Sequence, residues 1–357
     1  MHDGMKGWKQ VVVCFAATVI AAHAEAGQVF PFPSPDYIPV PSPDASPFGI
    51  VAGPSGEIWF TEQNQDRIGR IASDLHVDEL PIPVESSFAG PTAITLGSDG
   101  NLWFIEKSAN KIGRVTPTGT FTEFPVPSSD RFLIDIASGP DGKLWFTEQS
   151  FFRGAPEFGF VASISNSGTI NETRVSPGPY NIARGPDNAL WYTTNGIGRI
   201  TTNGQYHVFP IGDQFPADIA AGPDGAMWFT YLSPNPEVVG AAGQPAGGEP
   251  NNDIPTIGRL STDGVLTQFV GPFSDIRPSA IARGPEDNLW FTTESGGIWR
   301  VNEAGTFQQI GFDNAEPDPV YDLTAGADGK MWWTLPNSNR IGYVDSLFFL
   351  PINLAGG

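Results

Sequence analysis

The sequence has a single cysteine, Cys14, which lies in an apolar run near the N-terminus. One cysteine cannot form a disulfide within the chain, and no other thiol is present to act as a nucleophile or metal ligand. Histidine is almost as scarce, because only His76 and His207 lie beyond residue 26. The sequence therefore excludes thiol chemistry and leaves two residues for any histidine-based site in the body of the chain.

Basic residues are also few. Lysine and arginine total 19 against 39 aspartates and glutamates, which gives a formal net charge of −20 at pH 7. A surface this acidic repels phosphate groups, so the charge excludes nucleic acid as a partner and argues against binding to anionic membranes. Such charge is typical of a protein that stays soluble and monomeric. We therefore expect a monomer whose ligand is a small molecule, a peptide or a carbohydrate.

Long hydrophobic runs are absent apart from Val11–Ala22, which is too short to cross a bilayer as a helix. Two lysines precede this run, and Ala22-His23-Ala24 and Ala24-Glu25-Ala26 both fit the rule of small residues at a cleavage site. These features predict a signal peptide over residues 1–26 and one mature domain over residues 27–357. We therefore expect a secreted or periplasmic protein with no membrane span.

The chain beyond the predicted signal peptide is dominated by an internal repeat. Seven segments share the pattern Pro-x-x-Ile-Ala-x-Gly-Pro-Asp-Gly-x-Leu-Trp-Phe-Thr with variations, and helical periodicity is absent. The tryptophans of the seven copies are Trp59, Trp103, Trp145, Trp191, Trp228, Trp290 and Trp332. A period of roughly 40 residues made of short strands and turns is typical of propeller blades. The sequence therefore predicts an all-β fold, a seven-bladed β-propeller of four-stranded antiparallel blades.

The second repeat shows how one blade divides into strands. We predict strands over Pro91–Leu96, Leu102–Glu106, Lys111–Val115 and Phe121–Val126, separated by glycine-containing turns. A single blade cannot bury both faces of its sheet, whereas a closed ring can, because each sheet then packs on two neighbours. The Trp-Phe pairs are therefore predicted to be core residues between the blades.

Closure of the ring requires a fourth strand for the last blade. Tyr37–Val40 reads Tyr-Ile-Pro-Val and resembles the outer strands of other repeats, such as Glu123-Phe-Pro-Val126. We predict that it completes the seventh blade, with Ser346–Ile352 as the alternative.

Connections between the second and third strands vary in length, so we expect a ligand site on the face where they lie. Two of them are enlarged, over 149–159 and 231–256, and the first contains Phe151 and Phe152. The first strands of the blades begin on the same face with Phe48, Thr92, Ile134, Tyr180, Ala217, Ser279 and Tyr321. The predicted ligand-binding residues are Phe48, Phe151, Phe152, Tyr180, Tyr231, Ser279 and Tyr321.

Carboxylates are predicted to lie near the same face. Glu62, Glu106 and Glu148 end the second strands of three blades, and Asp135, Asp218 and Asp322 follow the first residue of three inner strands. Carboxylate oxygens suit Mg²⁺ or Ca²⁺, so Glu62, Glu106, Glu148, Asp135 and Asp218 are candidate metal ligands. The alternative interpretation is that these carboxylates cap the blade edges and stay solvated.

Several segments of the repeat carry a family resemblance. They are Gly139–Glu148 (Gly-Pro-Asp-Gly-Lys-Leu-Trp-Phe-Thr-Glu), Lys111–Val115 (Lys-Ile-Gly-Arg-Val), Arg67–Ile71 and Glu123–Pro127. The chain resembles the streptogramin B lyases, also called virginiamycin B lyases. The resemblance implies a propeller that opens the ester-linked ring of a cyclic depsipeptide by elimination, with a magnesium ion and a general-base histidine.

The sequence departs from that family pattern where the resemblance would place the catalytic histidines. Ser279 occupies the position in the sixth repeat, and Val320 or Tyr321 the position in the seventh. An enzyme built on this chain would need an acidic residue or a tyrosine as the base. The candidates are Glu294, Asp322, Tyr180 and Tyr321.

The sequence leaves three functional hypotheses open. The first is a lyase-like propeller that binds a ligand in an axial pocket without histidine-based elimination. The second is an active carbon–oxygen lyase of the virginiamycin B type, or a lactone-processing enzyme, that uses an acidic or tyrosine site. The third is a protein-interaction scaffold of the cell envelope that docks through the enlarged connections.

Overall fold

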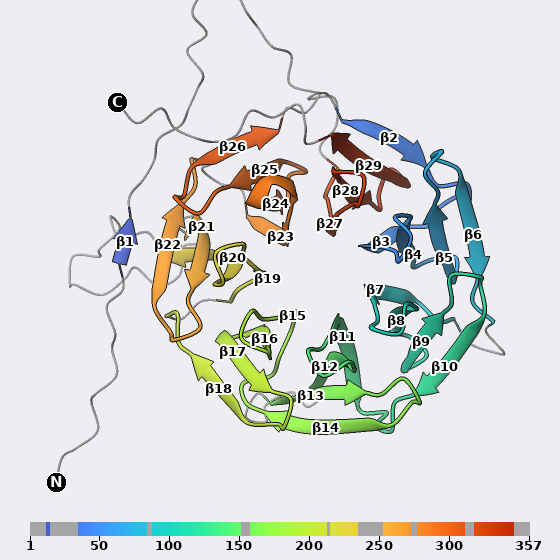
Figure 1. Cartoon of the computed structure of the whole chain (residues 1–357), viewed down its shortest axis with the longest axis horizontal. Helices are drawn as coiled ribbons and strands as arrows, with labels where there is room; N and C mark the ends of the chain where they lie inside the picture. Colours follow the sequence, from blue (N-terminus) through green and yellow to red (C-terminus); the bar gives the residue numbers. More distant parts are fainter. Residues whose placement is uncertain are drawn as a thin grey trace, which may run out of the picture.

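The seven repeats form seven antiparallel sheets arranged in a closed ring (Figure 1). The structure is a computed structural model that describes residues 12–14, 35–83, 88–150, 158–212, 215–234, 253–272, 277–310 and 318–345. Within these ranges the only helical element is a short 3₁₀ turn, η1 (Pro285–Asp287). The predicted seven-bladed β-propeller is confirmed.

Each blade runs from an inner strand beside the axis to an outer strand on the wall of the ring (Figure 1). The first three blades comprise β3 (Pro47–Ala52), β4 (Ile58–Glu62), β5 (Arg67–Ile71) and β6 (Val77–Pro81); β7 (Pro91–Leu96), β8 (Leu102–Glu106), β9 (Lys111–Val115) and β10 (Phe121–Pro125); and β11 (Arg131–Ser138), β12 (Leu144–Ser150), β13 (Gly159–Ile164) and β14 (Ile170–Val175).

The remaining blades follow the same order. They comprise β15 (Ile182–Arg184), β16 (Ala189–Thr194), β17 (Gly196–Thr201) and β18 (Tyr206–Phe209); β19 (Asp218–Ala221), β20 (Met227–Pro234), β21 (Asp253–Leu260) and β22 (Leu266–Val270); β23 (Pro278–Arg283), β24 (Leu289–Thr293), β25 (Ile298–Val301) and β26 (Phe307–Ile310); and β27 (Leu323–Ala325), β28 (Lys330–Leu335) and β29 (Arg340–Asp345) with β2 (Asp36–Pro39).

The strand β2 closes the ring as the outer strand of blade seven. It pairs antiparallel to β29, with Ile38 opposite Ile341, so the predicted closure by the N-terminal segment is confirmed. The alternative segment, Ser346–Ile352, lies outside the described residues. The Asn339 side chain reinforces the seam, because its Nδ2 donates to the carbonyl of Ser42 at 2.8 Å and its Oδ1 accepts from the Ala45 amide at 2.8 Å.

The predicted signal peptide lies outside the described residues except for β1 (Val12–Cys14), which runs parallel to β22 at the edge of blade five (Figure 1). In the part of the chain that the structure describes, no helix is long and apolar enough to cross a membrane.

The Trp-Phe pairs form the core between the blades, as predicted. Trp59 of blade one packs in the same cluster as Phe104 of blade two, and both side chains are fully buried. Glycines make room for these rings. A Cβ on Gly113 would lie 2.2 Å from the Phe104 ring, and a Cβ on Gly53 would lie 2.4 Å from Trp59 Nε1. The glycines of the Ile-Gly-Arg and Gly-Pro motifs are therefore required by the aromatic rings that lie over them.

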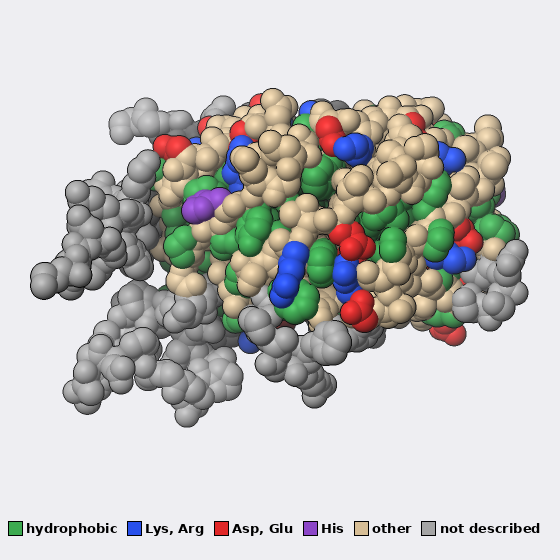
Figure 2. Space-filling view, turned by 90° about the horizontal axis from the view of Figure 1, so that it is seen from below, with side chains coloured by type: hydrophobic (Ala, Val, Ile, Leu, Met, Phe, Trp, Pro, Cys, Tyr) green, Lys and Arg blue, Asp and Glu red, His purple; other side chains and the backbone are tan. Residues whose placement is uncertain are grey.

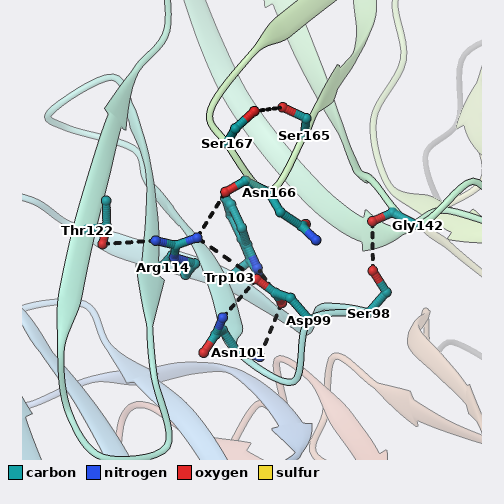
Figure 3. A network of polar contacts seen from close by, with 10 residues as sticks. All are labelled: Ser98, Asp99, Asn101, Trp103, Arg114, Thr122, Gly142, Ser165, Asn166 and Ser167. Carbon is teal, nitrogen blue, oxygen red and sulfur yellow. Dashed lines mark hydrogen bonds and ion pairs between the residues drawn. The ribbon is translucent and has the colours of Figure 1, made fainter.

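A polar network fixes the turn between the first two strands of blade two (Figure 3). In blade two, Asp99 Oδ1 accepts a hydrogen bond from Trp103 Nε1 at 3.1 Å. Arg114 Nη1 reaches the neighbouring blade and donates to the carbonyl of Asn166 at 3.0 Å, while Ser98 Oγ donates to the carbonyl of Gly142 at 2.7 Å. The same turn thus orients a core tryptophan and ties two blades together.

Charges on the outer wall are mixed. On the side seen in Figure 2, acidic and basic side chains lie next to one another with hydrophobic side chains between them. Ion pairs between third and outer strands include Lys111 Nζ of β9 with Glu123 Oε2 of β10 at 2.7 Å. Each such pair locally neutralises part of the negative charge.

Candidate functional site

Aromatic side chains gather where the inner strands begin. We call the side of the ring on which the inner strands of the blades begin the axial face. Five of the eight large hydrophobic side chains that are exposed in the described ranges lie at or just before an inner strand. They are Phe88, Phe132, Tyr180, Phe215 and Tyr321. Tyr321 packs against the half-buried Phe48 of the next blade, with ring centroids 4.7 Å apart.

The backbone beneath these aromatic residues is held by a two-armed bridge from the preceding blade. At the seam between blades seven and one, Thr334 Oγ1 donates to the carbonyl of Phe48 at 2.7 Å. The carboxylate of Asp322 accepts a hydrogen bond from the amide of Ile50 at 2.9 Å through Oδ2. The two arms clamp residues two positions apart, and Phe48 is one of them.

The same bridge recurs between blades three and four. Thr147 Oγ1 donates to the carbonyl of Tyr180 at 2.5 Å, and Asp135 Oδ2 accepts from the amide of Ile182 at 2.8 Å. Here the clamped residue is Tyr180, whose side chain is exposed.

The third bridge joins blades five and six. Thr230 Oγ1 donates to the carbonyl of Ser279 at 2.5 Å, and Asp218 Oδ2 accepts from the amide of Ile281 at 2.8 Å. The Ser279 hydroxyl lies 2.6 Å from Thr292 Oγ1 and is partly buried. The three Thr–Asp bridges therefore hold the backbone of three predicted ligand-binding residues, which are Phe48, Tyr180 and Ser279.

The bridging threonines were not identified from the sequence as site residues. Thr147, Thr230 and Thr334 are the third residue of the Trp-Phe-Thr pattern in their blades, although Trp stands in place of Phe at position 333. The signal for them was the recurrence of threonine in a strand otherwise made of large apolar residues. Thr61 in blade one forms only the first arm, to the carbonyl of Thr92 at 2.6 Å.

The aspartates of the bridges carry raised pKa values. Burial is the main cause, and it raises the pKa of Asp135 to about 7, of Asp218 to about 6 and of Asp322 to about 8. Each carboxylate also accepts a backbone amide from its own strand, for example Leu323 on Asp322 Oδ1 at 2.8 Å, which favours the charged form. Repulsion from Asp218 raises the pKa of both other aspartates further.

The glutamates at the ends of the second strands lie elsewhere. Glu62, Glu106 and Glu148 have no exposed surface, so they are not the solvated caps that the alternative interpretation of the sequence described. Each faces a glutamate on the outer strand of its own blade, and these partners are Glu79, Glu123 and Glu172. The structure thus separates the three glutamates into three carboxyl pairs.

Burial is again the main reason that these glutamates are weak acids. It raises the pKa of Glu62 and of Glu106 to about 8, and the facing glutamates raise it further. Hydrogen bonds between the facing carboxyls, Glu62 with Glu79 and Glu106 with Glu123, also favour the protonated form. In the third pair Arg131 Nη1 lies 3.2 Å from Glu148 Oε2 and 2.9 Å from Glu172 Oε2, and the pKa of Glu148 rises to about 7.

The remaining predicted residues are dispersed. Tyr231 is buried in the core between blades four and five, where its hydroxyl accepts a hydrogen bond from Gln268 Nε2. Glu294 is exposed directly after β24. Phe151 and Phe152 lie outside the described residues.

The candidate metal ligands are not grouped together among the described residues. No group of three or more His, Cys, Asp or Glu side chains within the described ranges is placed to hold a metal ion. Both oxygens of Asp135, Asp218 and Asp322 already accept backbone amides.

Neither described histidine lies on the axial face. His76 is in the turn between β5 and β6, with a side chain that is 70% exposed and Nε2 3.5 Å from Asp78 Oδ1. His207 lies on the outer strand β18, where its ring packs edge-on against Phe209.

Solved structures similar to this chain include a streptogramin B lyase and a virginiamycin B lyase. A streptogramin B lyase structure is 30% identical, with a TM-score of 0.71 over 87% of this chain and 96% of that one. A catalytically inactive histidine-to-alanine variant of virginiamycin B lyase from Staphylococcus aureus with quinupristin is also 30% identical, with a TM-score of 0.72 over 87% of this chain and 98% of that one. Hydrazine synthase of Kuenenia stuttgartiensis, at 14% identity and a TM-score of 0.67, shares the fold.

Among curated proteins, no sequence matches this chain. A family model does match. The model described as the virginiamycin B lyase family covers residues 23–177, 157–241 and 250–347, which together span most of the chain and all seven blades. The chain therefore belongs to the virginiamycin B lyase family.

Proposed function

We propose that this chain binds a small molecule, a peptide or a carbohydrate on its axial face, and that it does so without the histidine-based elimination that the family resemblance implies. The observation that carries the proposal is the combination of exposed aromatic side chains with a clamped backbone. Phe48, Tyr180 and Tyr321 offer apolar surface, and the Thr–Asp bridges fix the strands that carry or adjoin them. A preorganised aromatic surface binds with a small loss of conformational entropy.

The positions of the histidines support ligand binding rather than elimination. The Staphylococcus aureus lyase variant with a histidine replaced by alanine is catalytically inactive. In the present chain, Ser279 and Tyr321 open or precede inner strands where the resemblance implies histidines, and His76 and His207 lie on a turn and an outer strand. General-base catalysis requires the base within hydrogen-bonding reach of the proton that it removes.

Quinupristin is the probe that tests the proposal. We expect the purified protein to bind it in a calorimetric titration and to return it unchanged, with and without Mg²⁺. Tyr321→Ala should weaken binding, whereas Tyr206→Ala should not, because Tyr206 is equally exposed but lies on the outer strand β18. Ring-opened quinupristin in the chromatogram would refute the non-catalytic proposal, and absence of binding would refute this ligand class for the axial face.

We also propose that the protein is secreted or periplasmic. The support is the short apolar run Val11–Ala22 followed by small residues that suit cleavage. Expression of the full chain in its own cell type should give extracytoplasmic protein whose mass corresponds to loss of roughly the first 26 residues. Intact cytoplasmic protein would refute this.

A further inference from the structure

We infer that Asp135, Asp218 and Asp322 are positioning residues of the axial face, and that ionisation of their carboxyl groups sets the geometry of the ligand site. The consequence for ligand affinity rests on the proposed function. The inference concerns residues that need not touch a ligand, because each acts on the backbone beneath the residues that do.

The three Thr–Asp bridges share one geometry. In all three bridges the threonine holds the carbonyl of one residue and the aspartate holds the amide two residues later. The clamped residues are Phe48 and Ile50, Tyr180 and Ile182, and Ser279 and Ile281. Two arms on one short segment fix both its position and its rotation, so the bridges determine how the side chains of Phe48, Tyr180 and Ser279 are presented.

The bridge requires the carboxylate form. Each aspartate uses one oxygen for its own strand and the other for the next blade, as Asp218 does with Ile219 at 2.8 Å and Ile281 at 2.8 Å. A protonated carboxyl places a hydrogen on one of these oxygens, and hydrogen bonds to a charged acceptor are roughly twice as strong as neutral ones. Protonation therefore weakens the arm that crosses between blades.

The groups around the three aspartates determine the pH at which their carboxyls titrate. Asp135 interacts electrostatically with Asp218, and Asp322 interacts with both of them, so the three carboxyls lie within electrostatic reach of one another. Asp218 also accepts from Asn181 Nδ2 at 3.2 Å. Within the described ranges, the groups that perturb the three aspartates include no lysine, arginine or histidine. No cation therefore holds them ionised, and burial with mutual repulsion brings their titration close to neutral pH.

Two opposite pH dependences follow. Ionisation tightens the bridges, so ligand affinity should rise as pH increases through the titration of the three groups. Stability should change in the other direction, because a group whose folded pKa is raised stabilises the fold at low pH and loses that contribution as pH rises through the folded pKa. If the aspartates had a purely structural role, a change of pH would alter the stability of the protein but not its affinity for ligand.

The test that needs no ligand observes the clamped amides directly. Selective nitrogen-15 labelling of isoleucine reports the amides of Ile50, Ile182 and Ile281, which donate to the three carboxylates. Between about pH 5 and pH 9 we expect each amide proton to move downfield as its carboxylate ionises, because the charged acceptor makes the stronger hydrogen bond. Asp322→Asn, Asp135→Asn and Asp218→Asn should abolish the titration of the amides of Ile50, Ile182 and Ile281, respectively. Amides that do not titrate in wild-type protein would overturn the inference whether or not the variants fold.

The second measurement links the bridges to binding. Quinupristin should bind about fivefold more tightly at pH 8.5 than at pH 5.5, a range typical of coupling between sites. Asp218→Asn should flatten this dependence, whereas Asp130→Asn should leave it unchanged, since Asp130 is 59% exposed and forms no part of a bridge. Flat affinity in wild-type protein that nevertheless binds would overturn the inference. Titrating amides without any quinupristin binding would support the positioning role and refute binding of this ligand class on the axial face.

Discussion

Asp322 accepts a hydrogen bond from the amide of Ile50, a residue 272 positions away in the chain, at the seam where the last blade meets the first. The same seam contains the contact between Phe48 and Tyr321 and the pairing of β2 with β29. Closure of the ring and construction of the candidate site therefore depend on the same few residues.

Removal of the Asp322 carboxylate should weaken this seam. Asp322→Ala leaves the amides of Ile50 and Leu323 without their acceptors, and each unsatisfied buried donor costs about 1–3 kcal/mol. We expect a lower melting temperature near pH 6, measured by calorimetry. Asp130→Ala on the surface should change stability by less than about 0.5 kcal/mol. Equal melting temperatures for the Asp322 variant and wild type would contradict the bridging role of this residue.

Substitutions of Asn339 test ring closure in a second way, because they separate the contribution of the side chain to stability from that of the backbone. This residue has a φ of 57°, in the left-handed region that asparagine and glycine tolerate. Asn339→Gly keeps the backbone accessible but removes the hydrogen bonds to Ser42 and Ala45, whereas Asn339→Ala adds backbone strain of about 1 kcal/mol. Urea unfolding should rank the proteins as wild type, then glycine, then alanine. If the glycine variant matched wild type, the side-chain contacts would not stabilise the seam.

Blade one lacks the aspartate that orients the core tryptophan in five other blades, and this makes a stabilising substitution predictable. Ser55 stands at the turn position of Asp99, and the buried Nε1 of Trp59 has no hydrogen-bond partner. Ser55→Asp should supply the acceptor that Asp99 gives Trp103 and raise stability by about 1 kcal/mol. Ser55→Ala is the control and should not stabilise. A Ser55→Asp protein no more stable than wild type would show that this turn differs from the others.

The repeat allowed some strand boundaries to be predicted to within one residue. In blade two the predicted and observed strands differ only at Val126, because the turn glycines and the alternating strand residues constrain local structure strongly. The closing strand was predictable for the same reason, since Tyr37–Val40 resembles other outer strands.

The candidate site was less predictable, because register gives the face of a strand but not its surroundings. Glu62 and Glu106 end their strands as predicted, yet both side chains are completely buried. Asp322 was selected as a candidate base, but both of its oxygens accept backbone amides. The Thr–Asp bridges join segments that are far apart in sequence, as Thr334 and Phe48 are, and no local pattern reports such a contact.

The buried glutamates predict that the protein is more stable in mild acid than in mild alkali. The pKa of a free glutamate side chain is near 4.5, whereas the pKa of Glu62 and of Glu106 is about 8 in the folded protein. The folded state therefore binds protons that the unfolded state has released. Each group stabilises the fold fully below pH 4.5 and loses that contribution as pH rises to about 8, at roughly 1.4 kcal/mol per pH unit between these values.

Glutamine substitution isolates this effect, because glutamine has the shape of protonated glutamate and does not ionise. Glu106→Gln should match wild type near pH 5 and melt at a higher temperature than wild type at pH 9, where Glu106 would otherwise be charged beside Glu123 with only Lys111 as a counter-charge. Glu294→Gln, at an exposed position, should follow the wild-type profile at every pH. Melting temperatures of the Glu106→Gln and wild-type proteins, recorded from pH 5 to pH 9, test this prediction. If Glu106 is protonated at low pH, the two curves converge in acid. If Glu106 is already ionised in the native state at pH 6, the two curves run parallel instead.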